Sequence, residues 1–594
     1  MTKPILAYAQ PSVTPEQTGT RFALAKVTAR LLASKFSPST RLEQARSFCY
    51  AMLAEHWRAR CEAAGCSWEI GVGPVSTGPS DLELIEVAKN IGNAAAQMEP
   101  GKAAYMLGTV YTGMLPTDLR SAWGAYHTPP PYVNRLMDLA EKAGFDWTKG
   151  RVIDPACGGG AFLTPVALRM LAAMPDGSAE FRLARVTSRL RGAELDPFAA
   201  WMSHVLLESA MLPICVEAGK RLPNLITVGD SLGLDTLGEF DLVVGNPPYC
   251  RVTLTSVLRL KYSRSLYGHA NLYGLFTDLG IRLAKAGGLI AYVTPTSFLG
   301  GQYFKALREL MAEEAPPQFI DFMNHREGVF DDVLQETLLA VYRKGAVLAP
   351  VVVSCLTQVS ADAVKVAGAG NISLGKGSTP WLLPRDAEQD AFFEKLSALS
   401  CRLSDFGYSV STGPLVWNRH KEQLRTTKQG KGVYPLVWAE SVAANQFLFS
   451  AARRNHVPFI QVTKTQDHLL VKSSCVLVQR TTAKEQNRRL IAAVMPESFI
   501  KAYGAAVVEN HLNVVSQTNV SPISPATIAA VLNSQAVDAA FRCISGSVAV
   551  SAYELNALPL PDLKEMMTLE TLVTKGADNS LIEKRLNRIY GLKT

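Results

Sequence analysis

The sequence predicts a Rossmann-like, doubly wound α/β domain followed by a basic α+β domain. Short apolar runs with the composition of buried parallel strands end at glycine, proline or acidic residues, and stretches with helical spacing follow them. This alternation is typical of a mostly parallel sheet covered by helices. The charge also changes along the chain: residues 1–400 carry 38 basic and 38 acidic residues, whereas residues 401–594 carry 22 and 14. The formal excess of +8 therefore lies in the last third.

Composition indicates a globular protein with at least two large domains, because 48% of its 594 residues are hydrophobic and 19% are charged. No apolar run reaches 18 residues, and the N-terminus lacks a signal-peptide core, so we expect a cytoplasmic protein without a membrane segment. The ten cysteines are scattered, without a Cys-x-x-Cys pair. Neither a disulfide framework nor a metal site is indicated.

Alanine, leucine and isoleucine recur at helical spacing in residues 20–53 and 81–98, which predicts a helical N-terminal extension. Glycine, serine and proline accumulate between residues 370 and 380, as in a linker. The expected parts are the extension, the α/β domain, the linker and the α+β domain, at residues 1–114, 115–345, 346–385 and 386–594.

The turn Asn246–Tyr249 directly follows the apolar run Phe240–Val244, which has the composition of a buried strand. Two prolines remove two N–H donors and fix the backbone, so the Pro247 carbonyl can point into a site. With the side-chain oxygen of Asn246, it would offer two acceptors to one NH₂ group and localise its lone pair. Tyr249 supplies a ring for stacking. The turn thus predicts a site that makes a planar amine or amide nucleophilic, as methyl transfer requires.

A second motif precedes this turn: the strand start at Arg151 leads through Asp154 and Ala156 into a glycine turn and then a helical run to about Ala173. Glycines allow left-handed backbone and close approach of a ligand, and a helix N-terminus favours an anionic group. A glycine turn alone fits a dinucleotide site equally well.

Two acidic residues at later strand ends favour an adenosine-containing cofactor. Glu194 lies where ribose hydroxyls need an acceptor, and Asp230 where an adenine amino group does. Either could instead be a helix cap or turn residue, as we expect for Asp196 before Pro197. About 34 residues separate the glycine turn from Glu194, more than a compact βαβ unit needs, so an elongated helix or loop should pass through residues 175–177.

The order of these motifs resembles that of class I S-adenosylmethionine-dependent methyltransferases. Within them, the DNA adenine-N6 enzymes of type II restriction–modification systems with the gamma, TaqI-like arrangement are the most similar in layout. A helix start with Thr-Pro-Pro at Thr128 precedes the glycine turn, Asn271–Phe276 resembles the family's fifth motif, and Gly328–Phe330 resembles the eighth. The resemblance implies S-adenosylmethionine as cofactor, held by Thr128, Asp154, Ala156, Gly158, Gly160, Glu194, Asp230 and Phe276. It also implies that Phe330 stacks on the target base opposite Tyr249.

The C-terminal part resembles the TaqI-like specificity domain, because short segments recur in the same order: Ser411–Leu415, Val478–Ala483, Glu509–Asn513, Leu532–Ser534 and Val550–Leu555. Residues 411–490 carry 13 basic against four acidic residues, interleaved with aromatic side chains, which suits a phosphate backbone. The resemblance implies binding of double-stranded DNA, with the candidate contacts Arg480, Lys484, Arg488, Asn510 and His511.

The implied activity is methylation of the N6 amine of an adenine flipped out of duplex DNA, which protects host DNA. We expect a monomer, with a cognate restriction endonuclease that acts separately. The residues leave four alternatives open: an RNA adenine-N6 enzyme, a protein glutamine-N5 enzyme, N4-cytosine methylation, and a DNA-binding subunit without activity.

Overall fold

The computed structural model describes residues 15–75, 77–124, 127–235, 237–324, 336–360, 363–375, 377–385, 390–481, 488–544 and 549–592. The chain forms two compact units. The first comprises Met1–Pro295 and Glu309–Ala367, and the second comprises Thr296–Arg308 and Gly368–Thr594.

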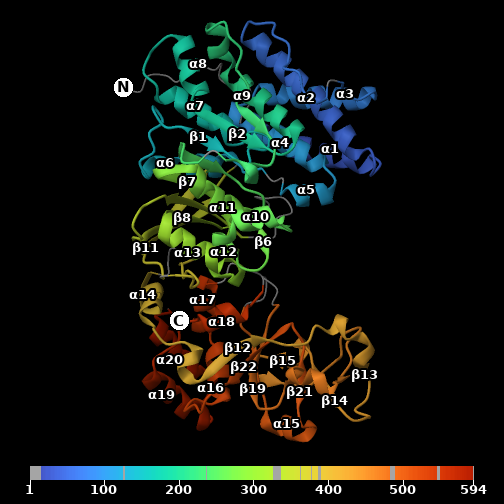
Figure 1. The fold of residues 1–594 in the computed structure, drawn as a ribbon, viewed down its shortest axis with the longest axis vertical. Coiled ribbons are helices and arrows are strands. Elements are labelled where there is room, and N and C mark those ends of the chain that lie inside the picture. Colours follow the sequence, from blue (N-terminus) through green and yellow to red (C-terminus); the bar gives the residue numbers. More distant parts are fainter. Residues whose placement is uncertain are drawn as a thin grey trace. The chain divides into compact units, whose positions relative to one another are not determined.

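A nine-stranded mixed sheet is the centre of the first unit, with the strand order β11-β10-β8-β9-β7-β4-β1-β2-β3 (Figure 1). The strands from β3 to β7 in this order are parallel, whereas β9 runs antiparallel to both of its neighbours. Leu242, Val243 and Val244 are fully buried, as expected of a central parallel strand. The strands are β1 (Val152–Asp154), β2 (Leu190–Glu194), β3 (Ile226–Val228), β4 (Phe240–Gly245), β7 (Ala284–Pro295), β8 (Pro317–Asn324), β9 (Thr337–Arg343), β10 (Val351–Gln358) and β11 (Val364–Ile372).

Helices cover both faces of this sheet because the direction of winding reverses at β1. The chain moves outward from β1 to β3 and then returns to β4 and β7. Since such crossovers are right-handed, the helices of the two halves lie on opposite faces. The outward helices α7, α8 and α9 contact one another, whereas α11 contacts β4 and β7. Their bounds, with those of α6 and α13, are α6 (Pro130–Lys142), α7 (Leu163–Ala173), α8 (Ala179–Thr187), α9 (Pro197–Glu217), α11 (Leu272–Leu283) and α13 (Lys305–Glu314).

The long gap between the glycine turn and Glu194 is filled by a separate helix. After α7, a short turn leads into α8, where the Ser178 side chain accepts from the backbone N–H of Phe181. The chain then enters β2. In place of the expected elongated helix or loop, the chain therefore forms two helices, α7 and α8, joined by a short turn.

The N-terminal helices pack on the sheet-covering helix α9 (Figure 1). Asp196 caps α9 and also accepts from Arg46 at 2.6 Å and from the Tyr111 hydroxyl at 2.5 Å, so it fastens two of these helices to the end of β2. Helix α9 is long and apolar enough to cross a membrane, but 83% of its apolar window is buried in the fold. The N-terminal helices are α1 (Pro15–Lys35), α2 (Arg41–Ala63), α3 (Leu82–Ala96), α4 (Pro100–Met114) and α5 (Thr117–Trp123).

The linker prediction for residues 346–385 is wrong over β10 and β11. Strand β10 pairs in parallel with β8, and Val351, Val353 and Leu356 on it are fully buried. The apolar residues at 351–353, 355 and 356 are a strand signal, and the turn residues that are typical of a linker follow them from residue 370.

The second unit combines small sheets with helices. One sheet has the antiparallel order β12-β22-β19-β20, and another has the order β13-β17-β14-β21-β18. Its longer strands are β12 (Tyr408–Thr412), β14 (Val433–Val437), β17 (Phe459–Gln461), β19 (Cys475–Gln479), β20 (Ala492–Met495), β21 (Ala506–Val508) and β22 (Leu512–Gln517). Its two-residue strands are β13 (Leu424–Arg425), β15 (Val442–Ala443), β16 (Gln446–Phe447) and β18 (Leu470–Val471). Its helices are α12 (Ser297–Gly300), α14 (Asp390–Ala398), α15 (Glu497–Tyr503), α16 (Pro525–Leu532), α17 (Gln535–Ile544), α18 (Ala552–Asn556), α19 (Leu563–Thr574) and α20 (Asn579–Tyr590).

Arg308 fastens the segment 296–308 into the second unit. Its guanidinium is fully buried and donates to the carbonyls of Phe298 at 2.6 Å and Ser378 at 2.8 Å, and to the Tyr553 hydroxyl at 3.0 Å. It is thus surrounded by main-chain and hydroxyl oxygens, which stabilise its charge in place of water.

We expect Arg308→Ala to lower the free energy of unfolding of the second unit by about 3 kcal/mol, because several buried carbonyls would lose their donor. Urea unfolding followed by tryptophan fluorescence measures this change. The exposed Lys564→Ala is the control and should change stability by less than about 0.5 kcal/mol. Equal stability of the two variants would refute the role of Arg308.

Candidate active site

Two turns meet at the carboxyl edge of the sheet because β1 and β4 are neighbours. Val152 pairs with Leu242 and Ile153 with Val243, so the turn after Asp154 lies beside the turn after Gly245. A Cβ atom on Gly245 would lie 2.6 Å from Asp154 Oδ1, which leaves room only for glycine. This is the point where the winding reverses, and ligands of open α/β sheets bind at that point.

The catalytic turn predicted from the sequence is Asn246–Tyr249, and its two polar side chains hold each other. The Tyr249 hydroxyl donates to Asn246 Oδ1 and lies 3.0 Å from the carbonyl oxygen of Val293 on β7. The Tyr249 ring meets Tyr273 edge-on at 6.1 Å. Burial raises the pKa of Tyr249 well above its usual value, so the hydroxyl remains a donor. The plane of the Asn246 amide is therefore fixed by a bond to Tyr249.

The glycine turn packs closely against helix α9. Gly158 and Gly160 have φ of +51° and +83°, in the left-handed region. A Cβ on Gly159 would lie 2.7 Å from Met202 Cε, and one on Gly160 would lie 2.7 Å from Ser203 Oγ. Helix α9, which carries both neighbours, therefore leaves room only for glycine at these two positions.

Two carboxyl groups, the buried Asp154 and the half-buried Glu194, face this turn without a cationic partner among the described residues. Asp154 Oδ1 accepts from the Ala156 N–H at 3.0 Å, and its Oδ2 has no hydrogen-bond partner within the described part of the chain. Glu194 accepts from the Gly158 N–H at 2.9 Å and the Asp196 N–H at 3.0 Å. Burial raises the pKa of Asp154 to about 8, and the nearby charge of Glu194 adds to this. Burial also raises the pKa of Glu194. A cationic ligand beside these groups would stabilise their ionised forms and lower both pKa values.

Residues before α6 contact both turns, and the sequence indicated only part of this contact. Gly124 has φ of +57°, and a Cβ there would lie 2.6 Å from Pro248 Cβ. His127 lies between Gly108 of α4 and Gly159, since a Cβ on either glycine would approach its ring within 2.8 Å. Burial lowers the pKa of His127 to about 4, so the ring is neutral at pH 7. Neither glycine contact has a signal in the sequence, because the backbone angle of Gly124 and the ring beside Gly108 appear only in the folded chain.

Thr128, predicted to bind the cofactor, is 1% exposed, and its Oγ1 is buried without a hydrogen-bond partner among the described residues. A buried hydroxyl normally has a partner, so this atom fits a bound polar ligand. Phe276 is buried on α11, and Ala156 belongs to the glycine turn. Asp230 is exposed and caps the 3-10 turn Ser231–Gly233, where it accepts from Leu232 N–H at 3.0 Å.

Phe330 and Lys484 lie outside the described residues. Among the other predicted DNA contacts, the pairing of β19 with β22 brings Arg480 beside Asn510, whose carbonyl accepts from Arg480 Nη1 at 3.2 Å. His511 is half exposed and pairs with buried Glu509 at 2.8 Å.

Arg488 lies elsewhere: it donates to the Asn533 carbonyl and lies 3.6 Å from Glu583 of α20. The structure therefore brings Arg480, Asn510 and His511 together, and it gives Arg488 partners of its own.

Comparison with known proteins identifies similar enzymes. The family model "Eco57I restriction-modification methylase" matches residues 220–330, which include the catalytic turn. The chain is 26% identical to Type II methyltransferase M.BsuBI of Bacillus subtilis over 443 residues, which cover 72% of this chain and 86% of that one. It is also 26% identical to Type II methyltransferase M.PstI of Providencia stuartii over 364 residues, 59% and 71% of the two chains.

Among solved structures, the Type IIL restriction-modification enzyme MmeI in complex with DNA has a similar fold, with a TM-score of 0.52 at 12% identity. The match covers 98% of this chain and 97% of that one. The chain is thus similar to methyltransferases of restriction–modification systems along most of its length.

The raised pKa of Asp154 predicts a pH dependence of stability. The folded protein holds this proton more tightly than the unfolded chain, so the carboxyl group should stabilise the fold less as pH rises from about 4 to about 8. We expect Asp154→Asn to remove this dependence, which amounts to at most about 1.4 kcal/mol of unfolding free energy per pH unit. Thermal unfolding of the protein without ligand, repeated across this pH range, measures it. Asp118→Asn, at an exposed position, is the control. Identical pH profiles of stability for Asp154→Asn and wild type would contradict the raised pKa of Asp154.

Proposed function

We propose that the protein transfers a methyl group from S-adenosylmethionine to the N6 amine of an adenine extruded from duplex DNA, and so protects host DNA in a restriction–modification system. The observation that carries this proposal is the adjacency of two turns. The glycine turn after Asp154 and the Asn246–Tyr249 turn lie side by side at the switch point between β1 and β4. A donor and an acceptor of a methyl group could therefore meet there.

The residues around the glycine turn fit the cofactor. S-adenosylmethionine would supply an activated methyl group on a positively charged sulfur. Asp154 and Glu194 provide a buried and a half-buried carboxyl group without a cationic partner among the described residues, and Thr128 provides a buried hydroxyl without a partner in the described chain. Glu194 would also accept from ribose hydroxyls, and Asp230 from the adenine amino group, while Phe276 would pack on the adenine ring.

The Asn246–Tyr249 turn would activate the target amine. Asn246 Oδ1 and the Pro247 carbonyl each accept one proton of the NH₂ group and draw its lone pair out of conjugation with the ring. Tyr249 fixes the Asn246 amide and stacks on the base, with Phe330 on the other face. No general base is required, because the methylated nitrogen loses its proton to solvent after transfer.

Duplex DNA is the substrate that the remaining features support. The second unit carries the basic excess, and its exposed Arg419, Lys431, Arg454 and Lys464 have no acidic partner among the described residues. Such a surface suits phosphates. Its predicted specificity residues are Arg480, Lys484, Arg488, Asn510 and His511. The relatives, which are named as Type II methyltransferases, match both the catalytic region and most of the chain.

One experiment distinguishes methylation of adenine in DNA from the four alternative functions. Methyl-labelled S-adenosylmethionine is incubated with the protein and duplex DNA, a structured RNA, or a glutamine-containing protein substrate, and the products are hydrolysed and identified by mass spectrometry. We expect N6-methyldeoxyadenosine from duplex DNA. N4-methylcytosine, preferential labelling of RNA or protein, or cofactor binding without transfer would each support one of the rival functions instead.

We expect Asn246→Ala to lower the single-turnover rate of methyl transfer by at least about 100-fold to 1000-fold, because one of the two acceptors of the amine is lost. Cofactor affinity, measured by calorimetry, should stay unchanged, since Asn246 does not belong to the glycine turn. A variant that still transfers methyl groups at the wild-type rate would contradict the role of the amide.

Substitutions at Tyr249 should separate its two roles. Tyr249→Phe removes the bond to Asn246 but keeps the ring, so we expect the rate to fall by up to about tenfold. Tyr249→Ala removes both, and stacking on a base contributes roughly 1–3 kcal/mol, so the rate should fall further. The comparison is made in single-turnover kinetics at saturating DNA. Equal rates for Phe and Ala variants would rule out stacking by Tyr249.

A further inference from the structure

The chain that follows the catalytic turn forms an arm that leaves the sheet and returns to it. The arm comprises residues 251–271. It begins at β5 (Arg251–Val252) and ends at β6 (Ala270–Asn271), and these two short strands pair antiparallel. Its outer part contains helix α10 (Ser256–Lys261), of which no residue is buried. The arm therefore presents a helix to solvent a few residues beyond Tyr249.

Two apolar side chains of α10 are exposed side by side. Val257 is 73% exposed and Leu260 is 77% exposed. They are three residues apart, so they lie on the same face of the helix. The helix is capped by Thr255, which accepts from the Leu258 N–H at 3.3 Å. Since no residue of α10 is fully buried and Val257 and Leu260 point away from the fold, a partner explains these two apolar side chains better than packing does.

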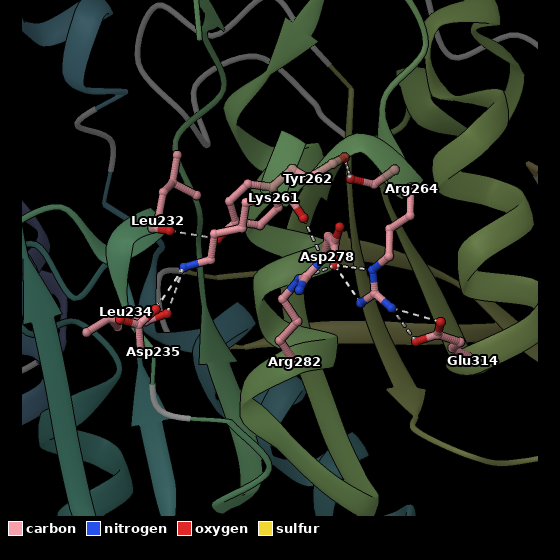
Figure 2. Close-up of polar contacts among 10 residues, drawn as sticks. Leu232, Leu234, Asp235, Lys261, Tyr262, Arg264, Asp278, Arg282 and Glu314 are labelled. Carbon is pink, nitrogen blue, oxygen red and sulfur yellow. Dashed lines mark hydrogen bonds and ion pairs between the residues drawn. The ribbon is translucent and has the colours of Figure 1, made fainter. Parts of the chain in front are cut away.

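Polar contacts fix Lys261, the last residue of α10, and the residues after it (Figure 2). Completely buried Asp278 of α11 accepts from Arg264 at 2.6 Å and from Arg282 at 2.9 Å. Further bonds join the arm to α11 and to the loop after Asp230: Arg282 to the Lys261 carbonyl at 2.7 Å, Tyr262 to the Leu232 carbonyl at 3.0 Å and Lys261 to the Leu234 carbonyl at 3.0 Å. The position of α10 is thus set relative to the site.

The charge of the arm favours an anionic partner. No acidic residue occurs from 242 to 277, whereas this stretch contains four basic residues. Lys261 and Arg264 are used at the base of the arm. Arg251 and Arg259 are exposed and have no acidic partner among the described residues, so their charges are available to a polyanion.

We propose that the arm is a wedge that enters duplex DNA at the target base pair. Val257 and Leu260 occupy the space that the extruded base leaves in the stack, and Arg251 and Arg259 contact the neighbouring phosphates. The proposal rests on the proposed function, because only an enzyme that extrudes a base creates this space.

The connectivity of the chain supports duplex DNA as the partner of the arm. The arm starts two residues after Tyr249, which stacks on the extruded base, so the wedge and the pocket belong to one continuous segment. Apolar side chains inserted between base steps compensate for the stacking that extrusion removes.

The test compares the double variant Val257→Ala/Leu260→Ala with Val347→Ala, which truncates an apolar side chain that is 86% exposed in the same unit. Methyl transfer is measured on a duplex with a sequence that the wild-type protein methylates, and extrusion is measured separately on the same duplex with 2-aminopurine in place of the target adenine. We expect the double variant to show reduced 2-aminopurine fluorescence and a single-turnover rate at least about tenfold below that of wild type. Cofactor affinity should be unchanged, and the control should behave as wild type.

A second substrate separates wedging from a general defect. When the target adenine faces an abasic site, it is less firmly held in the duplex, so the double variant should regain most of the wild-type rate. Arg251→Gln and Arg259→Gln should each reduce the slope of log affinity against log salt concentration by about one if they contact phosphates.

Three results would overturn the wedge. They are a double variant that matches the control on intact duplex, a defect equally large on the abasic substrate, and a change of oligomeric state on substitution, which would assign this face to a second copy of the chain. In all three, wild-type methylation of DNA would leave the proposed function standing. A wild-type protein that transfers no methyl group to DNA would contradict the proposed function itself.

Discussion

The parallel pairing of β1 with β4 is the constraint on which the site depends. It places Asp154 and Gly245 so close that a Cβ on Gly245 would lie 2.6 Å from the carboxyl group. The glycine turn and the catalytic turn are then held side by side by the main chain rather than by flexible side chains. A shift in this pairing would separate Asp154 from Asn246, and the two turns would no longer lie side by side.

Much of this site could be predicted from the sequence because its signals are local. The apolar run before Asn246, the two prolines and the glycines after Asp154 each restrict the backbone in a way that single residues reveal. The role of Asp196 as a cap was also readable from Pro197. The contacts of Gly108 and Gly124 were not, because their partners lie far along the chain. A glycine in a helix carries no sign of the ring that packs against it.

The N-terminal helices are accordingly part of the site and not an appendage. Gly108 of α4 makes room for His127, which in turn contacts the glycine turn, and Arg46 and Tyr111 hold Asp196 at the end of β2. Strand β10, by contrast, has a local signature in its apolar residues at 351–353 and 355–356, although turn residues follow after residue 370. The segment 296–308 belongs to the second unit through the buried Arg308, a contact with no local signature.

The most direct measurement of the central claim is a crystal structure of the protein with duplex DNA and an unreactive analogue of S-adenosylmethionine. The account predicts an extruded adenine whose N6 lies about 3 Å from Asn246 Oδ1 and from the Pro247 carbonyl, with the analogue's sulfur-equivalent atom pointing at it from the glycine turn. A base that remains stacked, or one bound away from Asn246 while the analogue occupies the glycine turn, would contradict it.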